Sequence, residues 1–588
     1  MLTITFAILT TLLSFVYLGP ILRNHIKPTE IGKTGYIGAI FGLSVGTLSL
    51  YMLFLGLLPG KWLMPQTVLP MPWIIIGGTI LGSTYKLQIS NNQDKFTNLI
   101  SIICFGGFTV ILINCLSYPF YRYDVLARFA PNARLLFETG TIPNSLTGYP
   151  LGIQMLYSFA FMAANSVNDH VAGLIIAGFS GAMLLTTFAV SKQLFSKRAA
   201  FSAVVLLLSS QIFVDWSTSG YVDIPVGVYH GLTFMFAYNW MLNGKQSDAI
   251  YSGIMIGLAL WTKQSAFVLI PAVCIVPLIR IKEYKHFHKE MKNVLISISV
   301  SLLIALPWYL RSYLLIGPDE VIPAPGAYDA QYIDNSIKQL LTFLTSPQEW
   351  GIALGSTIMI GITLCVIYCI QPNLDNVSTK TINPLYRSLL IGAFILPYHI
   401  IWWQNFSYDT RYLLSSAVIY ASVAGHAIDW LLKQLSPVFK PQNLFTILIM
   451  GTLVLFGSFN RIGAVYNLIV HPLQNDDDKL SRISTETWSL VQYIKTNIES
   501  NAKLYAMDGS LAYWLHDYQF KQGYPFHFDD IKDYDYLITS ETGNLVYKFY
   551  DSTDNEVIKN LNNSNMFSTI HQHSADIIIY KIHNVEQQ

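Results

Sequence analysis

Charged residues are scarce in this chain of 588 residues. Asp, Glu, Lys and Arg together make up 12% of the sequence, whereas a soluble domain has about 25%. Hydrophobic residues make up 52%, and the mean hydropathy is +0.41. This composition excludes a soluble globular enzyme and predicts an α-helical polytopic membrane protein. The net charge of +1 gives no support for a nucleic-acid partner.

Cysteine and the familiar catalytic motifs are also missing or rare. The five cysteines all lie in apolar segments, so neither a disulfide framework nor a Cys/His metal site is predicted. The sequence has no Walker A motif, no Gly-rich phosphate loop after a strand, no His-Glu-x-x-His and no nucleophile elbow. The candidate chemistry therefore rests on the few charged residues near the ends of apolar segments.

The apolar segments predict about 14 membrane crossings, since each is roughly 17–25 residues long. Basic clusters at Lys192–Arg198 and Arg280–Lys292 mark the cytoplasmic side by the positive-inside rule. If the segments 149–165 and 170–190 both crossed, the first cluster would face outward. We therefore expect residues 149–165 to form a re-entrant or outer-surface helix. This topology places Asp124 and Asp223 outside the cytoplasm.

Three regions follow from the distribution of apolar and charged residues. Residues 1–97 are expected to add N-terminal transmembrane helices, and residues 98–465 to form a transmembrane core with an outer loop at 119–148. From His471 onward the chain has 17 acidic and 9 basic residues, and residues 466–588 are predicted to form a small extracytoplasmic α/β domain. A Pro- and Gly-rich loop at about 315–350 is either a lid or a passive connector. The expected elements of the α/β domain are a helix at Thr487–Ile498 and apolar runs at Lys503–Met507, Tyr534–Thr539 and Asp576–Ile582.

Two aspartates near the ends of apolar segments are candidates for acid–base chemistry. Asp124 is suited to the N-cap of a short helix that Pro131 separates from a second one. It is either a general base at the membrane boundary or a helix cap paired with Arg128. Asp223, before Pro225, is likewise either a catalytic or metal-binding carboxylate or an N-cap. The sequence alone leaves both alternatives open.

Three cations have comparable positions. Lys263, between two short apolar runs, occupies a depth where a cation costs roughly 2.5–3.5 kcal/mol. Arg311 ends one predicted span and Arg411 begins another. Each is either a ligand for phosphate or a side chain that snorkels to the interface. The aromatic residues beside them are expected to form an interfacial belt; these are Trp308, Tyr309, Trp402 and Trp403.

The order of these motifs resembles the GT-C superfamily of integral-membrane glycosyltransferases. The likeness covers roughly residues 98–465 and is strongest to prokaryotic relatives of protein O-mannosyltransferases and of the aminoarabinose transferases that act on lipid A. The motifs that carry it are Tyr123-Asp124, Glu138-Thr-Gly140, Tyr149-Pro-Leu-Gly152, Lys192–Arg198, Tyr221-Val-Asp-Ile-Pro225, Gly257-Leu-Ala-Leu-Trp-Thr-Lys263, Pro307-Trp-Tyr-Leu-Arg311 and Arg411-Tyr412. The three extra spans at about 3–85 depart from the pattern, and so does Val125, which stands where protein O-mannosyltransferases have Glu after the Asp.

The resemblance implies transfer of a sugar from a polyprenyl phosphate or pyrophosphate carrier to an acceptor outside the cytoplasm. It makes Asp124 the base, with Asp223 as the second catalytic carboxylate. The acceptor is a glycan, a lipid or a protein, and a divalent metal between the two aspartates is allowed. A multi-pass protein of the plasma (inner) membrane, surrounded by lipid, is expected. The residues assigned to substrate are Arg128, Glu138, Tyr149, Lys263, Arg311, Arg411 and Tyr412.

Two other membrane functions share these features. A transporter or a flippase for lipid-linked glycans has a similar helix count, but the sequence has no internal repeat of the kind that transporters often show. An O-antigen ligase or polymerase is the other alternative. A cavity shared by Asp124, Asp223 and Lys263 would favour transfer, and an alternating-access path would favour transport.

Overall fold

The chain forms two compact units. The computed structural model describes residues 2–583 apart from 24, 82–94, 285–286, 318–329, 372–382, 436–443, 526, 541–556, 558–559 and 562–564. The first, which we call the helical unit, comprises Met1–Ser117, Leu136–Ala324 and Tyr332–Val470. The second, the sheet unit, comprises Tyr118–Leu135, Pro325–Gln331 and His471–Gln588. Part of the predicted lid loop, residues 318–329, lies outside the described residues. The predicted boundaries at 98 and 466 stay predictions.

The helical unit has the composition of a membrane protein. Among the described residues, seven helices are long and apolar enough to cross a membrane, or eight if the bent pair Leu448–Gly457 and Phe459–Val470 is one span. The seven are Thr3–Leu22, Pro28–Leu57, Asn98–Ser117, Asp169–Leu194, Phe287–Ile316, Ile352–Ile370 and Pro384–Asn405. The predicted class, a mostly helical polytopic membrane protein, is therefore confirmed. The count of about 14 crossings and the orientation stay predictions.

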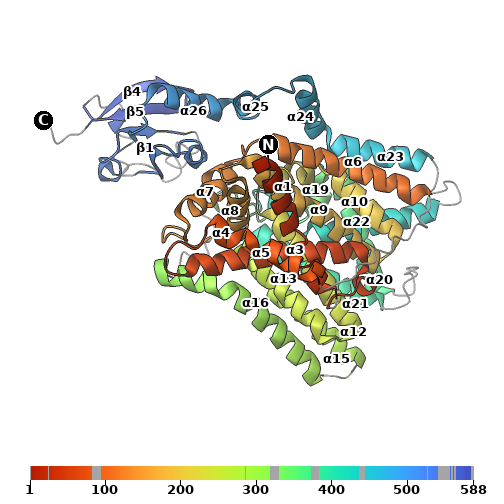
Figure 1. The fold of residues 1–588 in the computed structure, drawn as a ribbon. Coiled ribbons are helices and arrows are strands. Elements are labelled where there is room, and N and C mark those ends of the chain that lie inside the picture. Colours follow the sequence, from red (N-terminus) through yellow and green to blue (C-terminus); the bar gives the residue numbers. More distant parts are fainter. Residues whose placement is uncertain are drawn as a thin grey trace. The chain divides into compact units, whose positions relative to one another are not determined.

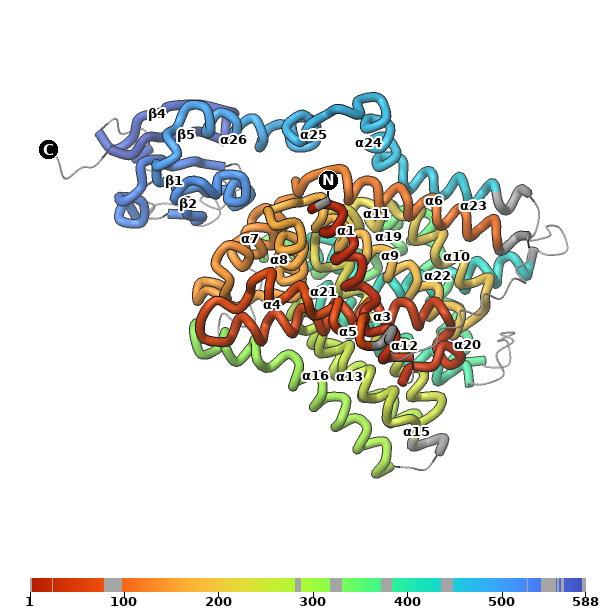
Figure 2. Tube along the Cα trace, in the orientation of Figure 1, coloured from red at the N-terminus to blue at the C-terminus, as the bar shows by residue number. Residues whose placement is uncertain are grey.

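The helices of this unit follow the chain from red to cyan in Figures 1 and 2. The N-terminal ones are α1 (Leu2–Ser14), α2 (Gly19–Leu22), α3 (Pro28–Leu57), α4 (Pro65–Val68), α5 (Pro70–Leu81) and α6 (Lys95–Ser117). The next are α8 (Gly152–Ala164), α9 (Asp169–Leu194), α10 (Lys197–Ser209), α11 (Gln211–Trp216), α12 (Asp223–Asn243), α13 (Gln246–Thr262), η2 (Gln264–Val268), α14 (Leu269–Val273), α15 (Ile275–Tyr284) and α16 (Phe287–Ile316). The last are α18 (Ile337–Leu340), α19 (Thr342–Thr345), η3 (Pro347–Trp350), α20 (Ile352–Ile370), α21 (Pro384–Asn405), η5 (Thr410–Ser416), α22 (Ala417–Leu435), α23 (Leu444–Gly457) and α24 (Phe459–Val470).

Helix α8 decides between the two interpretations of residues 149–165. It has 13 residues, which gives a length of about 20 Å, short of the roughly 30 Å hydrocarbon core. All of its residues are buried, and it packs against α1, α3 and α9. The outer-surface alternative is therefore wrong, because a helix that lies on the membrane surface would leave one face exposed. A short buried helix agrees with the re-entrant alternative.

Helices α13 and α16 approach each other closely because α13 presents glycines. A Cβ at Gly253 would collide with the backbone carbonyl of Ser297. A Cβ at Gly257, one turn later, would come within 2.7 Å of Ile304 Cβ. Small residues spaced four apart let two membrane helices pack backbone to backbone. This packing fixes the direction of α13, which ends directly before Lys263.

We expect Gly253→Val to destabilise the helical unit by roughly 1–3 kcal/mol, since the overpacked side chain has only backbone to displace. Thermal unfolding of the purified protein in detergent measures this loss. Gly463→Val is the matched control, because a Cβ at this helical glycine meets nothing within 4 Å. Equal melting temperatures for the two variants would contradict the close packing of α13 and α16.

The sheet unit contains a five-stranded mixed sheet of order β2-β1-β3-β5-β4. β1 is parallel to both β2 and β3, whereas β5 is antiparallel to β3 and β4. The strands are β1 (Lys503–Ala506), β2 (Gln519–Gln522), β3 (Tyr536–Ile538), β4 (Phe567–Gln572) and β5 (Ile578–Ile582). The predicted strands at 503–507, 534–539 and 576–582 are thus confirmed within a few residues. The sequence missed β2 and β4, which are the polar, largely exposed edge strands and lack an apolar alternation.

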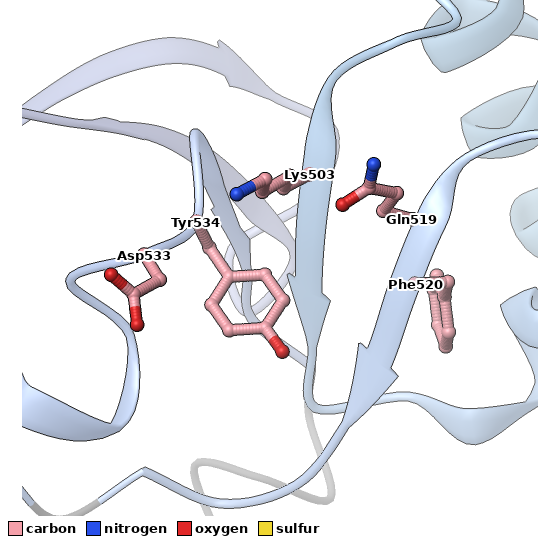
Figure 3. A pocket seen from close by; sticks show the side chains of 5 residues that line it. All are labelled: Lys503, Gln519, Phe520, Asp533 and Tyr534. Atoms are coloured by element: carbon pink, nitrogen blue, oxygen red, sulfur yellow. The ribbon is translucent and has the colours of Figure 1, made fainter.

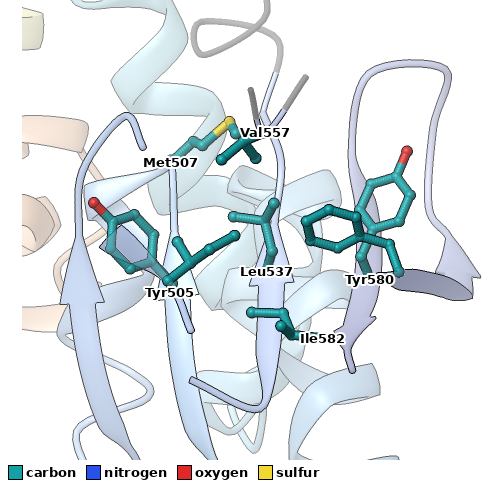
Figure 4. Packing of buried hydrophobic residues seen from close by; sticks show 8 residues of the cluster. Tyr505, Met507, Leu537, Val557, Tyr580 and Ile582 are labelled. Carbon is teal, nitrogen blue, oxygen red and sulfur yellow. The ribbon is translucent and has the colours of Figure 1, made fainter. Parts of the chain in front are cut away.

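One hydrophobic cluster of the sheet unit lies on a single face of this sheet. Tyr505, Leu537 and Tyr580, from three neighbouring strands, pack with Met507 and Ile582 (Figure 4). The helices of this unit are α25 (Asp476–Ile483) and α26 (Thr485–Asn497). The latter confirms the helix predicted at 487–498, and it buries Trp488, Leu490, Val491 and Ile494.

Residues 118–135 fold with the sheet unit, although some 340 residues separate them from His471 in the chain. Their π-helical turn η1 (Val125–Phe129) packs against η6 (Gly509–Ala512), the turn that follows β1. The rings of Phe120 and Tyr513 meet edge to face with centroids 6.0 Å apart. Burial and the nearby positive charge of Arg134 lower the pKa of His516. The segment that carries Asp124 is therefore a part of the C-terminal unit.

Candidate active site

Three elements of the helical unit bring charged side chains together around Asp223. Lys263 Nζ donates a hydrogen bond to Asp223 Oδ1 at 2.7 Å. Arg411 Nε lies 3.8 Å from the other carboxylate oxygen and 3.2 Å from Asp409 Oδ2. Asp223 comes from the first residue of α12, Lys263 from the end of α13, and Arg411 from η5. We call Asp223, Lys263, Asp409, Arg411 and Tyr412 the charged cluster.

Local sequence explains why each side chain of the cluster leaves its element there. Lys263 has extended backbone angles that end α13, so its side chain projects from the tip between α13 and η2. Asp409 caps η5 by accepting the Arg411 N–H at 2.9 Å. A Cβ at Gly227 would lie 2.9 Å from the Leu414 carbonyl oxygen, so this glycine lets α12 approach η5. The cluster is therefore fixed by backbone packing.

Aromatic rings surround the two cations. The Arg411 guanidinium lies 4.7, 4.8 and 4.9 Å from the ring centroids of Trp216, Tyr221 and Tyr412. Lys263 Nζ lies 4.3 Å from the centroid of Tyr412. Cations within about 6 Å of a ring face are attracted by its quadrupole. Tyr412 therefore contacts both cations, and the rings partly replace the water that burial removes.

The low exposure of the charged cluster strengthens the attraction between its cations and carboxylates. The Asp223 side chain is 3% exposed, Lys263 12% and Arg411 10%, whereas Asp409 is 31% exposed. The two cations are matched by two carboxylates, Asp223 and Asp409, so the cluster has no formal net charge. Because Asp409 is the more exposed carboxylate, an anion that displaces it from Arg411 would be held by a charge-assisted hydrogen bond.

The cluster does not fit a metal ion as it stands. Both oxygens of Asp223 face cations, and a divalent ion would add positive charge beside them. Among the residues that the structure describes, no group of three or more His, Cys, Asp or Glu side chains is placed to hold a metal. Asp124 and Asp223 belong to different units, so a shared metal between them stays a prediction.

Neither aspartate caps a helix with its side chain, whereas the pairing of Asp124 with Arg128 stays a prediction. Asp223 is the first residue of α12, and its side chain makes an ion pair and no cap bond. Asp124 has helical angles of φ −62° and ψ −30°, and its side chain makes no cap hydrogen bond. The helical turn begins before it, because the Leu126 N–H already donates to the Arg122 carbonyl. Neither carboxylate accepts a hydrogen bond from the first backbone N–H groups of its helix.

Pro131 does not separate two short helices. Helical backbone continues from residue 123 to 139, through η1 and then α7 (Ala130–Thr139). The Ala130 N–H bonds to the Val125 carbonyl, and this wider π-type turn precedes the proline, which has no N–H of its own. Gly140, with φ +68°, follows the end of α7.

Arg311 is occupied by a loop of the helical unit. Its guanidinium donates to the carbonyl oxygens of Leu146 at 2.6 Å and Pro143 at 2.8 Å. Trp308 Nε1 donates to the carbonyl of Gly148 at 3.2 Å, in the same loop. These bonds fix the residues directly before Tyr149. The role of Arg311 as a phosphate ligand stays a prediction, and the structure shows it holding the 142–148 loop.

The aromatic-belt interpretation is wrong for most of its members. Trp308 and Trp402 are 0% and 1% exposed, and Tyr309 is 9% exposed. The Tyr309 hydroxyl donates to the carbonyl of Leu260 at 3.0 Å, and Trp402 Nε1 donates to that of Asp409 at 2.9 Å. These rings brace the ends of α13 and η5 inside the protein, because their N–H and O–H groups find backbone partners there.

The remaining predicted site residues lie between residues 124 and 149 of the chain. Arg128 is exposed within η1, Glu138 is exposed near the end of α7, and Tyr149 is half-buried after the loop that Arg311 holds. Asp124 lies immediately before η1 in the sheet unit. Their roles toward a substrate stay predictions.

Sequence analysis missed three members of the site. Asp409 stands two residues before Arg411, and Trp216 and Tyr221 flank the turn before α12. An Asp whose side chain binds the backbone N–H two residues later is typical of a helix N-cap. This pattern was the signal in the sequence for Asp409. Trp216 carries no sequence signal that separates it from core residues, whereas Tyr221 stands in the motif Tyr221-Val-Asp-Ile-Pro225. Asp215, another carboxylate near this turn, is paired outside the cluster, with Arg461 Nε at 2.9 Å.

Comparison with known proteins supports the resemblance to glycosyltransferases. Residues 150–310 match the sequence family described as Dolichyl-phosphate-mannose-protein mannosyltransferase. This range includes Asp223 and Lys263 of the charged cluster. No curated protein matches the chain by sequence.

Solved structures share the fold at low sequence identity. ArnT from Cupriavidus metallidurans bound to undecaprenyl phosphate is 12% identical, with a TM-score of 0.57 over 84% of this chain and 99% of that chain. The apo state of the same protein is 11% identical, with a TM-score of 0.56 over 83% of this chain and 98% of that chain.

An archaeal protein extends this likeness. The oligosaccharyltransferase AglB from Archaeoglobus fulgidus, in complex with an inhibitory peptide and a dolichol-phosphate, is 11% identical, with a TM-score of 0.53 over 84% of this chain and 74% of that chain. The chain therefore shares its fold with ArnT and AglB, and its mannosyltransferase family match covers the part that holds Asp223 and Lys263.

Proposed function

We propose that this protein is a membrane glycosyltransferase that moves a sugar from a polyprenyl-phosphate or polyprenyl-pyrophosphate donor to an acceptor outside the cytoplasm. The observation that carries the proposal is the buried charged cluster of Asp223, Lys263 and Arg411, within a fold shared with ArnT and AglB. Structures of those two proteins contain undecaprenyl phosphate and a dolichol-phosphate, respectively. A lipid-linked donor presents its phosphate at the membrane boundary, where a cation beside a hydrophobic groove can bind it.

The proposed chemistry assigns separate roles to the two aspartates. An acceptor hydroxyl attacks the anomeric carbon, the new oxygen–carbon bond forms, and the bond from that carbon to the phosphate oxygen breaks. Asp124 accepts the hydroxyl proton, and the lipid phosphate leaves with the electron pair. Lys263 and Arg411 stabilise the negative charge on the leaving phosphate, and Asp223 holds both cations in place. No step requires a metal.

The proposal also includes a topology. About 14 crossings would place the charged cluster and the sheet unit outside the cytoplasm, in the plasma membrane. This assignment is supported by the basic loops at Lys192–Arg198 and Arg280–Lys292, which would then face the cytoplasm.

Incubation of the purified protein with radiolabelled polyprenyl-phosphate sugars and a panel of glycan, lipid and protein acceptors tests the function. We expect the radiolabelled sugar to move from its lipid carrier to one class of acceptor. Without a suitable acceptor, we expect slow hydrolysis of the donor to release the sugar into water. Movement of intact lipid-linked sugar across liposomes without cleavage would identify a flippase or transporter and refute the proposal.

We expect Arg411→Ala to raise the KM for the donor by about tenfold or more, the effect of losing one hydrogen bond to a charged group. The KM for the acceptor should change much less. Arg461→Ala is the matched control, because it removes an arginine–aspartate pair of the same unit outside the charged cluster. Equal rises in both KM values would remove Arg411 from the donor site.

A further inference from the structure

A polar pocket lies on the sheet unit, at the start of β1 and β2 and beside the core of the sheet. Its volume is about 240 Å³, and it is lined by Lys503, Gln519, Phe520, Asp533 and Tyr534. At about 30 Å³ for each water, the space corresponds to roughly eight waters. It is smaller than the roughly 300–1,000 Å³ of sites for drug-sized molecules, so its size suits one ring with its substituents.

Backbone geometry places the lining residues together. Lys503 and Gln519 are direct partners in the parallel register of β1 and β2. Side chains of paired residues project on the same side of a sheet. Asp533 and Tyr534 come from the turn before β3, which pairs with the other edge of β1. Figure 3 shows the Tyr534 ring between Asp533 and the two strands that carry Lys503 and Gln519.

Three polar side chains of the pocket are available to bind a ligand. Within the described part of the chain, the side chains of Lys503, Gln519 and Asp533 have neither a hydrogen-bond partner nor an ion-pair partner. Neighbouring charges behave differently: Lys532 pairs with Asp529 at 2.9 Å, and the Asp535 carboxylate accepts the Lys503 N–H at 2.7 Å. An amine, an amide and a carboxylate that line one pocket without pairing leave both donors and acceptors to a ligand.

The ring in the pocket is held in one orientation. Tyr534 meets Tyr505 edge to face, with centroids 5.2 Å apart and an interplanar angle of 89°. Lys521 Nζ lies over both rings, at 5.3 Å from Tyr505 and 5.9 Å from Tyr534. A fixed aromatic ring beside polar groups of both signs matches a pyranose, which has apolar C–H faces and a rim of hydroxyls that both donate and accept. A strongly anionic or cationic ligand would meet one like charge in this pocket.

We infer that this pocket binds one pyranose unit of a glycan and that the sheet unit thereby holds the acceptor. The second half of this inference rests on the proposed transferase function, and the first half does not. Among the three acceptor classes that the sequence leaves open, the pocket favours the glycan.

Saturation-transfer NMR with the full-length protein in lipid nanodiscs, which avoid sugar-headed detergents, tests the pocket. The probes are cellotetraose, mannotetraose and chitotetraose. We expect at least one to bind, and Gln519→Ala and Asp533→Asn each to weaken it by about tenfold, as expected for loss of a hydrogen bond to a polar or charged group. Asp529→Asn, on the same turn and 82% exposed, is the matched control and should bind as the wild type does.

A transfer assay separates this inference from the function it rests on. With a glycan acceptor, Gln519→Ala should raise the acceptor KM by about tenfold and leave donor hydrolysis unchanged. Absence of binding by all three tetrasaccharides, binding of peptides alone, or equal binding by Gln519→Ala, Asp533→Asn and wild type would overturn the pocket assignment. Saccharide binding by a protein that neither cleaves nor transfers the donor would support the pocket and refute the transferase.

Discussion

Asp124→Asn is expected to lower the rate of sugar transfer by about 10²–10⁴, the usual contribution of a general base. The amide keeps the shape of the carboxylate but cannot accept the acceptor proton. Asp124 makes no cap hydrogen bond and has helical angles next to η1, so the substitution removes no helix-ending contact. We expect kcat to fall while the KM for the donor and the melting temperature change little. Single-turnover transfer from radiolabelled donor measures the effect.

Asp477→Asn is the control for Asp124→Asn. Asp477 is an exposed carboxylate in the first turn of α25, in the same sheet unit, and its loss should leave transfer intact. Transfer by Asp124→Asn at near the wild-type rate would refute the assignment of the base. A fall in melting temperature equal to the fall in activity would instead make Asp124 a structural residue.

Asp223→Asn is expected to destabilise the helical unit strongly. The substitution leaves the buried Lys263 without its carboxylate partner and leaves Arg411 with the half-buried Asp409 alone, and removing one partner of a buried ion pair costs roughly 3–5 kcal/mol. Donor turnover should fall as well, because the cations lose the carboxylate that positions them. Thermal unfolding in detergent and donor hydrolysis measure the two losses.

A double variant separates charge from packing. Lys263→Met combined with Asp223→Asn removes one cation together with the carboxylate. The double variant should therefore lose less stability than the sum of the losses of the two single variants. Asp215→Asn is the matched control, since the Asp215–Arg461 pair is more exposed, at 22% and 13%, than Asp223 and Lys263. Additive losses, or an Asp223→Asn cost no greater than that of Asp215→Asn, would contradict a tightly coupled cluster.

Placement of Asp124 in the sheet unit has a consequence for mechanism. Its segment packs on η6, directly after β1, while the pocket that we assign to a pyranose lies at the start of β1 and β2. Both the proposed base and the proposed acceptor site therefore belong to one compact unit. The cations proposed for the donor phosphate belong to the other. The proposed function therefore takes its base from one unit and its phosphate-binding cations from the other.

The sequence by itself determined the class of the protein and much of its local structure. A low charge content and long apolar segments are sufficient for a helical membrane protein, because burial of unpaired charge in lipid is costly. The end of α13 at Lys263 was also predictable, since a cation interrupts the apolar run there. Strands β1, β3 and β5 were predictable from their apolar residues, whereas the polar edge strands were not.

Only the tertiary structure decided which charges meet. Lys263 and Asp223 are 40 residues apart in sequence, and each alone had a plausible local role as a snorkelling cation or a helix cap. The same holds for Arg311, whose donors bind a loop, and for residues 118–135, which join a domain at the far end of the chain. Ion pairs and ring contacts depend on distances of a few ångströms between elements, and such distances are set by helix packing rather than by any local pattern of residues.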